Sequence, residues 1–362
     1  MKVLVLNSGS SSVKYALFDS QNLIRSALIE RVENHDEAIA DILSEIGTID
    51  AVGHRVVHGG ETYTGPVRID STVIQAIEDL IPLAPLHNRA NLAGIKAVQR
   101  LFPDIPQIAV FDTSFHQSIP DYAYRYALPE KLYTLNKIRR YGFHGTSHHF
   151  LLKAAAAYLE RPTHELNLIT FHLGNGDSVC AIQNGKSIDI SMGFTPLEGL
   201  IMGTRSGDID PEIVIYLQQH MQMGSDDIDT LLNKESGLKG LCGMSDMRDV
   251  AKAARHGDEK AQLAINMFTY HAKKYLGSYF AILGRVDGII FSGGIGEHSA
   301  MIREKILYGL NHMGIEVDLI KNDRESTKTF EISTPDSKIK VLATHTDEEL
   351  EIALETIGII SQ

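Results

Sequence analysis

Cysteine is scarce in this chain, and long hydrophobic runs are missing from it. The 362 residues include two cysteines, Cys180 and Cys242, which excludes a disulfide framework or a thiolate metal cluster. No run of about 18 apolar residues occurs, as a membrane-spanning helix requires, and the first residues show no signal-peptide pattern. We therefore expect a cytoplasmic protein without a membrane partner.

Blocks of basic residues are also missing. The chain has 34 Lys and Arg against 46 Asp and Glu, which gives a formal net charge of −12. This balance argues against a nucleic-acid partner, and an anionic substrate would need a local basic pocket. With 362 residues, of which 43% are hydrophobic, the chain is long for one core and indicates two domains.

Glycine, in contrast, gathers in residues 166–211. An apolar strand there breaks at His172–Gly176, a hairpin follows, and a Gly-rich loop then carries a lone arginine, Arg205. Glycine lets backbone N–H groups approach a ligand closely, and a guanidinium on such a loop suits a phosphoryl oxygen. Two hairpins joined by ordinary turns are the alternative.

A similar polar hairpin opens the chain. Strands at residues 2–6 and 13–18 flank Asn7 and a serine-rich turn. The turn's hydroxyls can bind phosphate and its oxygens can ligate Mg²⁺, although a solvated turn is the alternative. Residues 10–13 resemble residues 176–179, since each set follows one apolar strand and enters another. Two such hairpins suggest a duplicated domain with a cleft between the copies.

Two more candidates lie near the ends of predicted strands. A strand at residues 49–57 carries Arg55, and a strand at residues 108–111 ends at Asp112. Catalytic carboxylates often follow strands in α/β folds, although a turn aspartate is the alternative.

Helix signals organise the remaining segments. Ser147 is expected to cap a helix at residues 148–160, and Ser245 a shorter helix. Residues 258–283 form an amphipathic helix whose apolar stripe indicates core packing. A strand at residues 286–291 leads into the glycine-rich turn Ser292–Glu297 before another helix, an arrangement that suits a nucleotide but lacks Rossmann spacing.

Taken together, these segments resemble the acetate kinase family, within the superfamily of acetate and sugar kinases, heat-shock 70 proteins and actin. The resembling stretches occur in family order and cover nearly the whole chain: LVLNSGSSSVKYALF, VGHRVVHGGE, LAPLHN, VFDTSFH, YGFHGTSH, HLGNGDSV, TPLEGLIMGTRSGDIDP, GLCGMSDMRD, FSGGIGEHSA and DEEL.

The resemblance implies an α/β fold of duplicated ribonuclease H-like (actin-like ATPase) domains with an active-site cleft between them. The first domain would comprise residues 1–148 with 349–362, and the second residues 149–348. The implied activity is reversible, direct in-line phosphoryl transfer from the co-substrate ATP to acetate, giving acetyl phosphate and ADP. It would require Mg²⁺, with Mn²⁺ as a substitute, and a homodimer is implied.

The resemblance also assigns site residues. Catalytic roles fall to Asp112, His144 and Arg205, and the metal to Asn7 and Glu348, with Glu349 as the alternative to Glu348. Acetate would bind among Arg55, Val57, Leu86, His87, Phe143 and Pro196. The nucleotide would contact Ser10, Ser12, Lys14, His172, Leu173, Gly174, Asn175, Gly176, Asp246, Met247, Arg248, Gly294, Ile295, Gly296, Glu297 and His298.

The chemistry of acetate defines what these residues must do. Acetate is already an anion at neutral pH, so the site must supply charge neutralisation and alignment rather than a strong base. We therefore expect Asp112 to orient an arginine or a metal-bound water, and we give His58, His116 and His149 no role.

Three other functions stay open. The first is a propionate or butyrate kinase. Val57 argues against it, because a valine there would crowd the longer acyl chain of these acids. The second is a metal-dependent carbamoyl-transfer protein that uses His144 and His148 as ligands. The third is a non-catalytic nucleotide switch, which would not need Arg55 and Arg205.

Overall fold

The structure, a computed structural model, describes residues 1–9, 12–32, 34–85 and 87–362. It divides into two compact units. The first comprises Met1–Gln117, Phe143–Phe150 and Asp347–Gln362, and the second Ser118–Gly142 and Leu151–Thr346. The domains expected from the sequence differ from these units mainly at residues 118–142, which here belong to the second unit.

The first unit contains a six-stranded sheet in the order β3-β2-β1-β4-β6-β5. The strands β1, β2 and β3 form an antiparallel meander, β4 and β6 extend it in parallel, and the short β5 is antiparallel to β6. The bounds of these strands are β1 (Lys2–Ser8), β2 (Ser12–Asp19), β3 (Asn22–Glu30), β4 (Ala51–Val56), β5 (Val67–Arg68) and β6 (Gln107–Phe111).

The second unit repeats this topology. Its sheet, in the order β9-β8-β7-β10-β12-β11, again joins an antiparallel meander to two parallel strands and an antiparallel edge strand. The bounds are Leu168–Leu173, Asp177–Gln183, Lys186–Ile190, Gly288–Ser292, Phe330–Glu331 and Lys340–Ala343 for β7 to β12. The turn between β7 and β8 occupies the same place as the turn between β1 and β2, so the duplication inferred from the two polar hairpins is confirmed.

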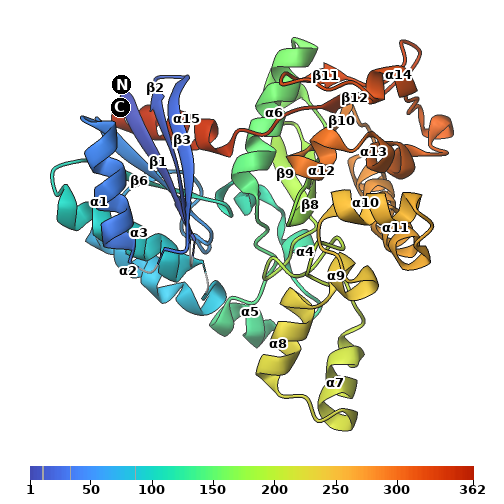
Figure 1. Ribbon diagram of the computed structural model, residues 1–362, viewed down its shortest axis with the longest axis horizontal. Coiled ribbons are helices and arrows are strands. Elements are labelled where there is room, and N and C mark those ends of the chain that lie inside the picture. Colours follow the sequence, from blue (N-terminus) through green and yellow to red (C-terminus); the bar gives the residue numbers. More distant parts are fainter. Residues whose placement is uncertain (10–11, 33, 86) are drawn as a thin grey trace. The chain divides into compact units, whose positions relative to one another are not determined.

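Alternation along β1 explains how the first sheet is covered. Leu4 and Leu6 pack in one core cluster with residues of α1 and α3, while Val3 and Val5 pack with residues of α15, because successive side chains of a strand point to opposite faces. The helices α1 (His35–Ile46) and α3 (Asn88–Leu101) thus lie on one face and α15 (Glu348–Ile360) on the other (Figure 1). The helix α2 (Ser71–Asp79) packs against α3.

A long helix organises the core of the second unit. The amphipathic helix expected at residues 258–283 is α11 (Glu259–Leu283), and its stripe, including Ala264, Ile265 and Phe268, is buried against residues of β7 and β8. The other helices of this unit are α4 (Asp121–Tyr124), α5 (Glu130–Asn136), α7 (Pro211–His220), α8 (Ser225–Lys234), α9 (Gly237–Cys242), α10 (Met247–Arg255), α12 (Gly293–His298), α13 (Ala300–Leu307) and α14 (Leu319–Asn322), while α6 (Gly145–Leu159) belongs partly to each unit. Within the described residues, no helix is both long and apolar enough to cross a membrane.

Two expected helix caps are wrong by a few residues. Helix α6 already begins at Gly145, so Ser147 is a buried residue of its first turn rather than its cap. Helix α10 is capped by Asp246, whose side chain accepts a hydrogen bond from the N–H of Arg248, and not by the preceding Ser245. Serine and aspartate are comparable caps, so the sequence pattern alone does not choose between neighbours.

Two buried histidines predict that the protein is labile in acid. Burial lowers the pKa of His54 and of His116 to about 4, despite hydrogen bonds with Gln107 and the Phe143 carbonyl. Since the unfolded chain protonates near pH 6.5, their contribution to stability is complete above that pH and is lost as the pH falls towards 4. Each shift corresponds to roughly 3 kcal/mol.

We expect the melting temperature to fall steeply between pH 6.5 and 4.5 in a pH series followed by circular dichroism. His116→Gln, which retains an N–H donor, should make the decline shallower, whereas His164→Gln, at an exposed position, should leave it unchanged. Equal slopes for the three proteins would contradict this explanation.

Candidate functional site

The first unit places an arginine and an aspartate in direct contact at the ends of two neighbouring strands. Arg55 of β4 donates two hydrogen bonds to Asp112, from Nε to Oδ1 at 3.0 Å and from Nη2 to Oδ2 at 2.6 Å. Parallel pairing of β4 with β6 aligns Arg55 with Val110. Asp112 comes two residues after Val110, so its side chain lies on the same face of the sheet as Arg55 and within reach of it. Asp112 is therefore in contact with an arginine, and its role in orienting that arginine stays a prediction.

More carboxylates surround this pair. Glu348, in the first turn of α15, has an oxygen 3.9 Å from Nε of Arg55, and the neighbouring Glu349 lies 2.5 Å from the ammonium of Lys14. The carboxylates of Asp112, Glu348 and Glu349 therefore face two cations, those of Arg55 and Lys14. The carboxylates are in excess, and their oxygens are the ligands that a divalent cation such as Mg²⁺ prefers. Glu349 is thus paired with Lys14, whereas Glu348 faces Arg55 at the longer distance.

Burial and charge set the protonation of the pair. Burial raises the pKa of Asp112 above its usual value and Glu348 adds to this, although Arg55 opposes it. For Arg55, burial alone would lower the pKa, but the surrounding carboxylates raise it overall. The guanidinium is therefore permanently charged and held in one orientation by a planar partner.

His144 is fixed beside this pair by the backbone. It has a φ of 59°, and the N–H of the next residue, Gly145, donates to the carbonyl of Asp112 at 2.9 Å. A Cβ on Gly145 would lie 2.2 Å from that carbonyl oxygen, so only glycine permits this approach. His144 precedes α6, whereas His148 lies fully buried inside the helix, so the two do not share a helix face as a metal pair would need.

The expected acetate-binding residues of the first unit are partly described. Val57 and Phe143 are buried, and His87 directly precedes α3. Leu86, like Ser10 of the expected phosphate turn, lies outside the described residues. Asn7 and Ser12 lie in the paired strands β1 and β2, where Asn7 pairs with Lys14.

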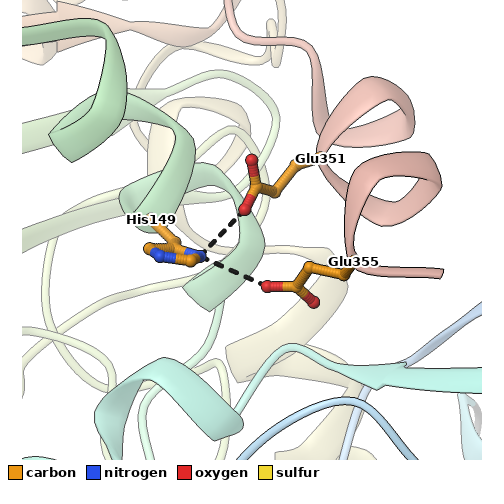
Figure 2. A group of neighbouring side chains, drawn as sticks. All are labelled: His149, Glu351 and Glu355. Carbon is orange, nitrogen blue, oxygen red and sulfur yellow. Dashed lines mark hydrogen bonds and ion pairs between the residues drawn. The ribbon is translucent and has the colours of Figure 1, made fainter. Parts of the chain in front are cut away.

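His149, which had no assigned role, links two helices of the first unit. Its Nδ1 lies 2.9 Å from Oε1 of Glu351 and 3.2 Å from Oε1 of Glu355 (Figure 2). The ring also stacks on Phe115, with 5.3 Å between the ring centroids. These contacts join α6 to α15 and account for the residue structurally.

A cavity of about 800 Å³ lies in the second unit. It is lined by residues from the turn after β7, from the start of α10 and from α12 with its following cap. Eight of its lining residues were expected to bind the nucleotide: Gly174, Asn175, Asp246, Met247, Arg248, Gly294, Ile295 and His298. Three segments distant in sequence thus converge on one site of a size suited to a nucleoside phosphate.

Five other expected nucleotide-binding residues of the second unit do not line this cavity: His172, Leu173, Gly176, Gly296 and Glu297. Glu297 instead accepts a hydrogen bond from the N–H of Thr346 at 3.1 Å and lies 2.8 Å from Nδ1 of His345. Although burial would raise it, the pKa of Glu297 is lowered overall by these contacts. The guanidinium of Arg248 is held by Asp246, and the side chain of Arg248 is 90% exposed.

Arg205 lies in the loop after β9 with Pro196. Its Nη1 donates to the carbonyl of Pro196 at 2.6 Å. Burial lowers the pKa of Arg205, and the nearby carboxylate of Asp177 opposes this shift. Asp177 itself accepts a hydrogen bond from the N–H of Gly174 at 2.6 Å, so it links the turn at the cavity to the charge of Arg205.

Several residues that line the cavity were not predicted from the sequence. Ser245, Ala251, Arg255 and Ser299 also line the cavity. Asp177 was recognised as part of the hairpin, but its contact with the turn was not expected. Its position three residues after Gly174, where a side chain can accept from a turn N–H, is the signal that could have found it.

Comparisons with known proteins identify the relationship. Residues 36–354 match the model of the acetokinase family. The chain belongs to this family. It is 48% identical to an acetate kinase from Desulfotalea psychrophila and 49% identical to one from Caldicellulosiruptor bescii, in both cases over the full length of both chains.

Solved structures of the acetokinase family agree with this fold. A Porphyromonas gingivalis acetate kinase is 41% identical and superposes with a TM-score of 0.94 over 99% of each chain. A Francisella tularensis propionate kinase, also 41% identical over 99% of each chain, gives a TM-score of 0.91. The α/β fold with two sheets of like topology is therefore the fold of these kinases.

Gly293 offers a test of the cavity. It has a φ of +77°, and a Cβ there would lie 2.5 Å from the carbonyl oxygen of Leu173. We expect Gly293→Ala to displace α12 from the turn after β7, to weaken ATP binding at least tenfold in calorimetry and to cost about 1–3 kcal/mol of stability.

The matched control is Gly277→Ala inside α11, where a Cβ would meet nothing within 4 Å. It should leave ATP affinity unchanged and should not lower the melting temperature, because alanine favours a helix. Normal ATP affinity in Gly293→Ala would contradict the assignment of this cavity to the nucleotide.

Proposed function

We propose that the protein is an acetate kinase, which transfers a phosphoryl group reversibly between ATP and acetate. The observation that carries the proposal is the guanidinium of Arg55, fixed by the two hydrogen bonds that it donates to Asp112, in a chain similar over its full length to acetate kinases. A guanidinium held in this way is an anion-binding group that needs no reorganisation when its ligand arrives.

Different residues of the proposed site bind the two anionic groups, the acetate carboxylate and the transferring phosphoryl group. Arg55 binds the acetate carboxylate, and Val57 with Phe143 contacts its methyl group. Arg205 and His144 stabilise the charge on the transferring phosphoryl group, where an arginine can contribute roughly 10³–10⁵ in rate. Asp112 keeps Arg55 aligned and takes no proton, since acetate is already a nucleophile.

The nucleotide and the metal complete the proposal. ATP occupies the cavity of the second unit, with its phosphates towards the turn His172–Gly176. Glu348 and Asn7 are proposed to hold Mg²⁺, directly or through water, and Mn²⁺ would occupy the same oxygen ligands. The cation would neutralise the polyphosphate that the acetate anion approaches. We place the enzyme in the cytoplasm, where the free thiols of Cys180 and Cys242 stay reduced.

A propionate kinase is the second candidate, because a propionate kinase is among the similar structures. Buried Val57 favours the shorter acid, since a branched side chain against the acyl group leaves less room. One methylene discriminates by only about 10–200-fold, so both acids belong in the same assay.

The test is formation of acetyl phosphate from ATP and acetate in the presence of Mg²⁺. Arg205→Ala should lower kcat at least 10³-fold while the ATP dissociation constant changes less than threefold, because Arg205 does not line the cavity. The control Arg285→Ala removes an exposed arginine and should retain full activity. Preference for propionate in the wild type would select the second candidate, and no product from either acid would refute the proposal.

We further propose that the enzyme is a homodimer in which α7 contributes to the interface. The sequence of α7, PEIVIYLQQH, is strongly apolar, yet none of its residues is buried. Ile213 is 46% exposed and Tyr216 57%. An apolar helix face open to water is typical of a protein–protein interface. We assign a second copy of this chain as the partner that covers this face of α7.

Ile213→Asp combined with Tyr216→Asp should convert the dimer to a monomer in light scattering coupled to size-exclusion chromatography, because two charges would be buried without partners. Gln218→Asp adds a charge at an exposed position of the same helix and should leave the dimer intact. A monomeric wild type would exclude the homodimer, and a dimeric double variant would place the interface elsewhere.

A further inference from the structure

The loop that carries Arg205 has little regular structure to hold it. Residues 191–210, between β9 and α7, include neither helix nor strand, and irregular segments of this length are uncommon in compact domains. Nevertheless Leu200, Ile201 and Met202 within it are buried. Backbone hydrogen bonds hold parts of the loop, such as those from Leu238 to Met202 and from Lys239 to Gly203, and side-chain contacts add to them.

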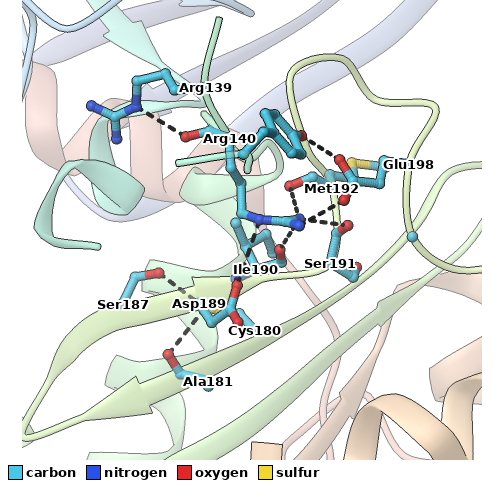
Figure 3. Close-up of polar contacts among 12 residues, drawn as sticks. Arg139, Arg140, Cys180, Ala181, Ser187, Asp189, Ile190, Ser191, Met192 and Glu198 are labelled. Carbon is cyan, nitrogen blue, oxygen red and sulfur yellow. Dashed lines mark hydrogen bonds and ion pairs between the residues drawn. The ribbon is translucent and has the colours of Figure 1, made fainter. Parts of the chain in front are cut away.

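Arg140 supplies the first of these contacts. Its Nη1 donates to three successive carbonyls, those of Ile190, Ser191 and Met192, at 2.8, 3.1 and 3.1 Å, and its Nη2 donates to Oε1 of Glu198 at 2.6 Å (Figure 3). One guanidinium thus ties the end of β9 to a side chain in the middle of the loop.

Tyr126 supplies the second. Its hydroxyl donates to Oε2 of Glu198 and accepts a hydrogen bond from the N–H of Phe194 at 2.9 Å. Both oxygens of Glu198 are therefore engaged. The fit is tight, since a Cβ on Gly193 would lie 1.6 Å from Oε2 of Glu198.

The contacts of Glu198 are connected to Arg205 through the backbone of the loop. Glu198 lies two residues after Pro196, whose carbonyl accepts the hydrogen bond from Arg205 at 2.6 Å. The N–H of Gly199 donates to Asp208 at 2.8 Å, and Tyr275 donates to the other oxygen of Asp208 at 2.7 Å. Fixing Glu198 therefore fixes the carbonyl against which Arg205 is oriented.

We propose that Arg140, Tyr126 and Glu198 act as positioning residues that hold the loop so that Arg205 points at the transferring phosphoryl group. The proposal rests on the proposed kinase function and on the role given there to Arg205. Glu198 itself does not touch the phosphoryl group, because both of its oxygens are bound and its charge is balanced by Arg140. A 1 Å error in the position of a charged group can cost a large factor in rate, which is the reason for so many contacts.

Tyr126→Phe is the most selective variant. It removes one hydroxyl without adding volume. The hydrogen bond to Glu198 and the one from the N–H of Phe194 are lost with it. We expect kcat to fall at least tenfold, as for a lost hydrogen bond to a charged group, while the dissociation constant for ATP changes less than twofold. Tyr124→Phe is the control, since its hydroxyl contacts Tyr133 at 3.2 Å rather than the loop, and it should keep full kcat.

A double variant tests whether Tyr126 acts through Arg205. In an Arg205→Lys background, Tyr126→Phe should reduce kcat by less than twofold further, because the group that it positions is no longer there. A full tenfold additional loss would overturn the proposal, as would wild-type kcat in Tyr126→Phe.

Hydrogen exchange gives a readout that does not depend on activity. Amides of residues 193–206 should exchange at least tenfold faster in Tyr126→Phe than in the wild type, and at the wild-type rate in Tyr124→Phe. Unchanged exchange rates in Tyr126→Phe would overturn the proposal that Tyr126 helps to fix the loop. Failure of the wild type to form an acyl phosphate would instead refute the proposed function and leave the exchange result to decide whether the loop is held.

Discussion

The contact between Arg55 and Asp112 is the interaction on which the first unit's site depends. It exists because β4 and β6 are parallel neighbours that end at the same edge of the sheet. Asp112 is almost fully buried, and removal of one member of a buried pair leaves an uncompensated charge at a cost of roughly 3–5 kcal/mol. The sheet therefore places the charges. The backbone of Asp112 also bonds the N–H of Gly145 at the start of α6, and Arg55 lies 3.9 Å from Glu348 at the start of α15.

The repeated sheet explains why the second unit has a cavity at the end of its central strands. In each unit, the first two strands are joined by a polar turn, and the neighbouring parallel strand ends beside it. In the second unit that strand, β10, leads into α12, and this junction brings Gly294 and the turn at Gly174 to one cavity. In the first unit, β4 instead carries Arg55. One topology has thus been given two chemical roles by different residues at equivalent strand ends.

Strand periodicity and strand ends allowed much of this to be predicted from sequence. The hairpin duplication, the orientation of Arg55 by Asp112, and the convergence of Gly174, Asp246 and Gly294 all follow from local patterns combined with family order. The strand β3 was not predicted, because its residues are nearly all exposed and show no alternation. Glu198 was not assigned a role either, since its partners Tyr126 and Arg140 lie 72 and 58 residues away. Such contacts depend on tertiary packing, to which no local pattern points.

The two arginines of the proposed site differ in how their charge is balanced, and this difference fits their roles. Arg55 is surrounded by three carboxylates, which fix it but also offset its charge. Such an arginine suits acetate, a weak anion that must bind and leave readily. Arg205 donates to a carbonyl of its own loop and has Asp177 nearby, so more of its charge is available to a ligand. A phosphoryl group in transfer spreads its charge over three oxygens, and the role proposed for Arg205 is to stabilise that charge. The carboxylate that holds the loop of Arg205, Glu198, is accordingly bound to Arg140 rather than to Arg205 itself.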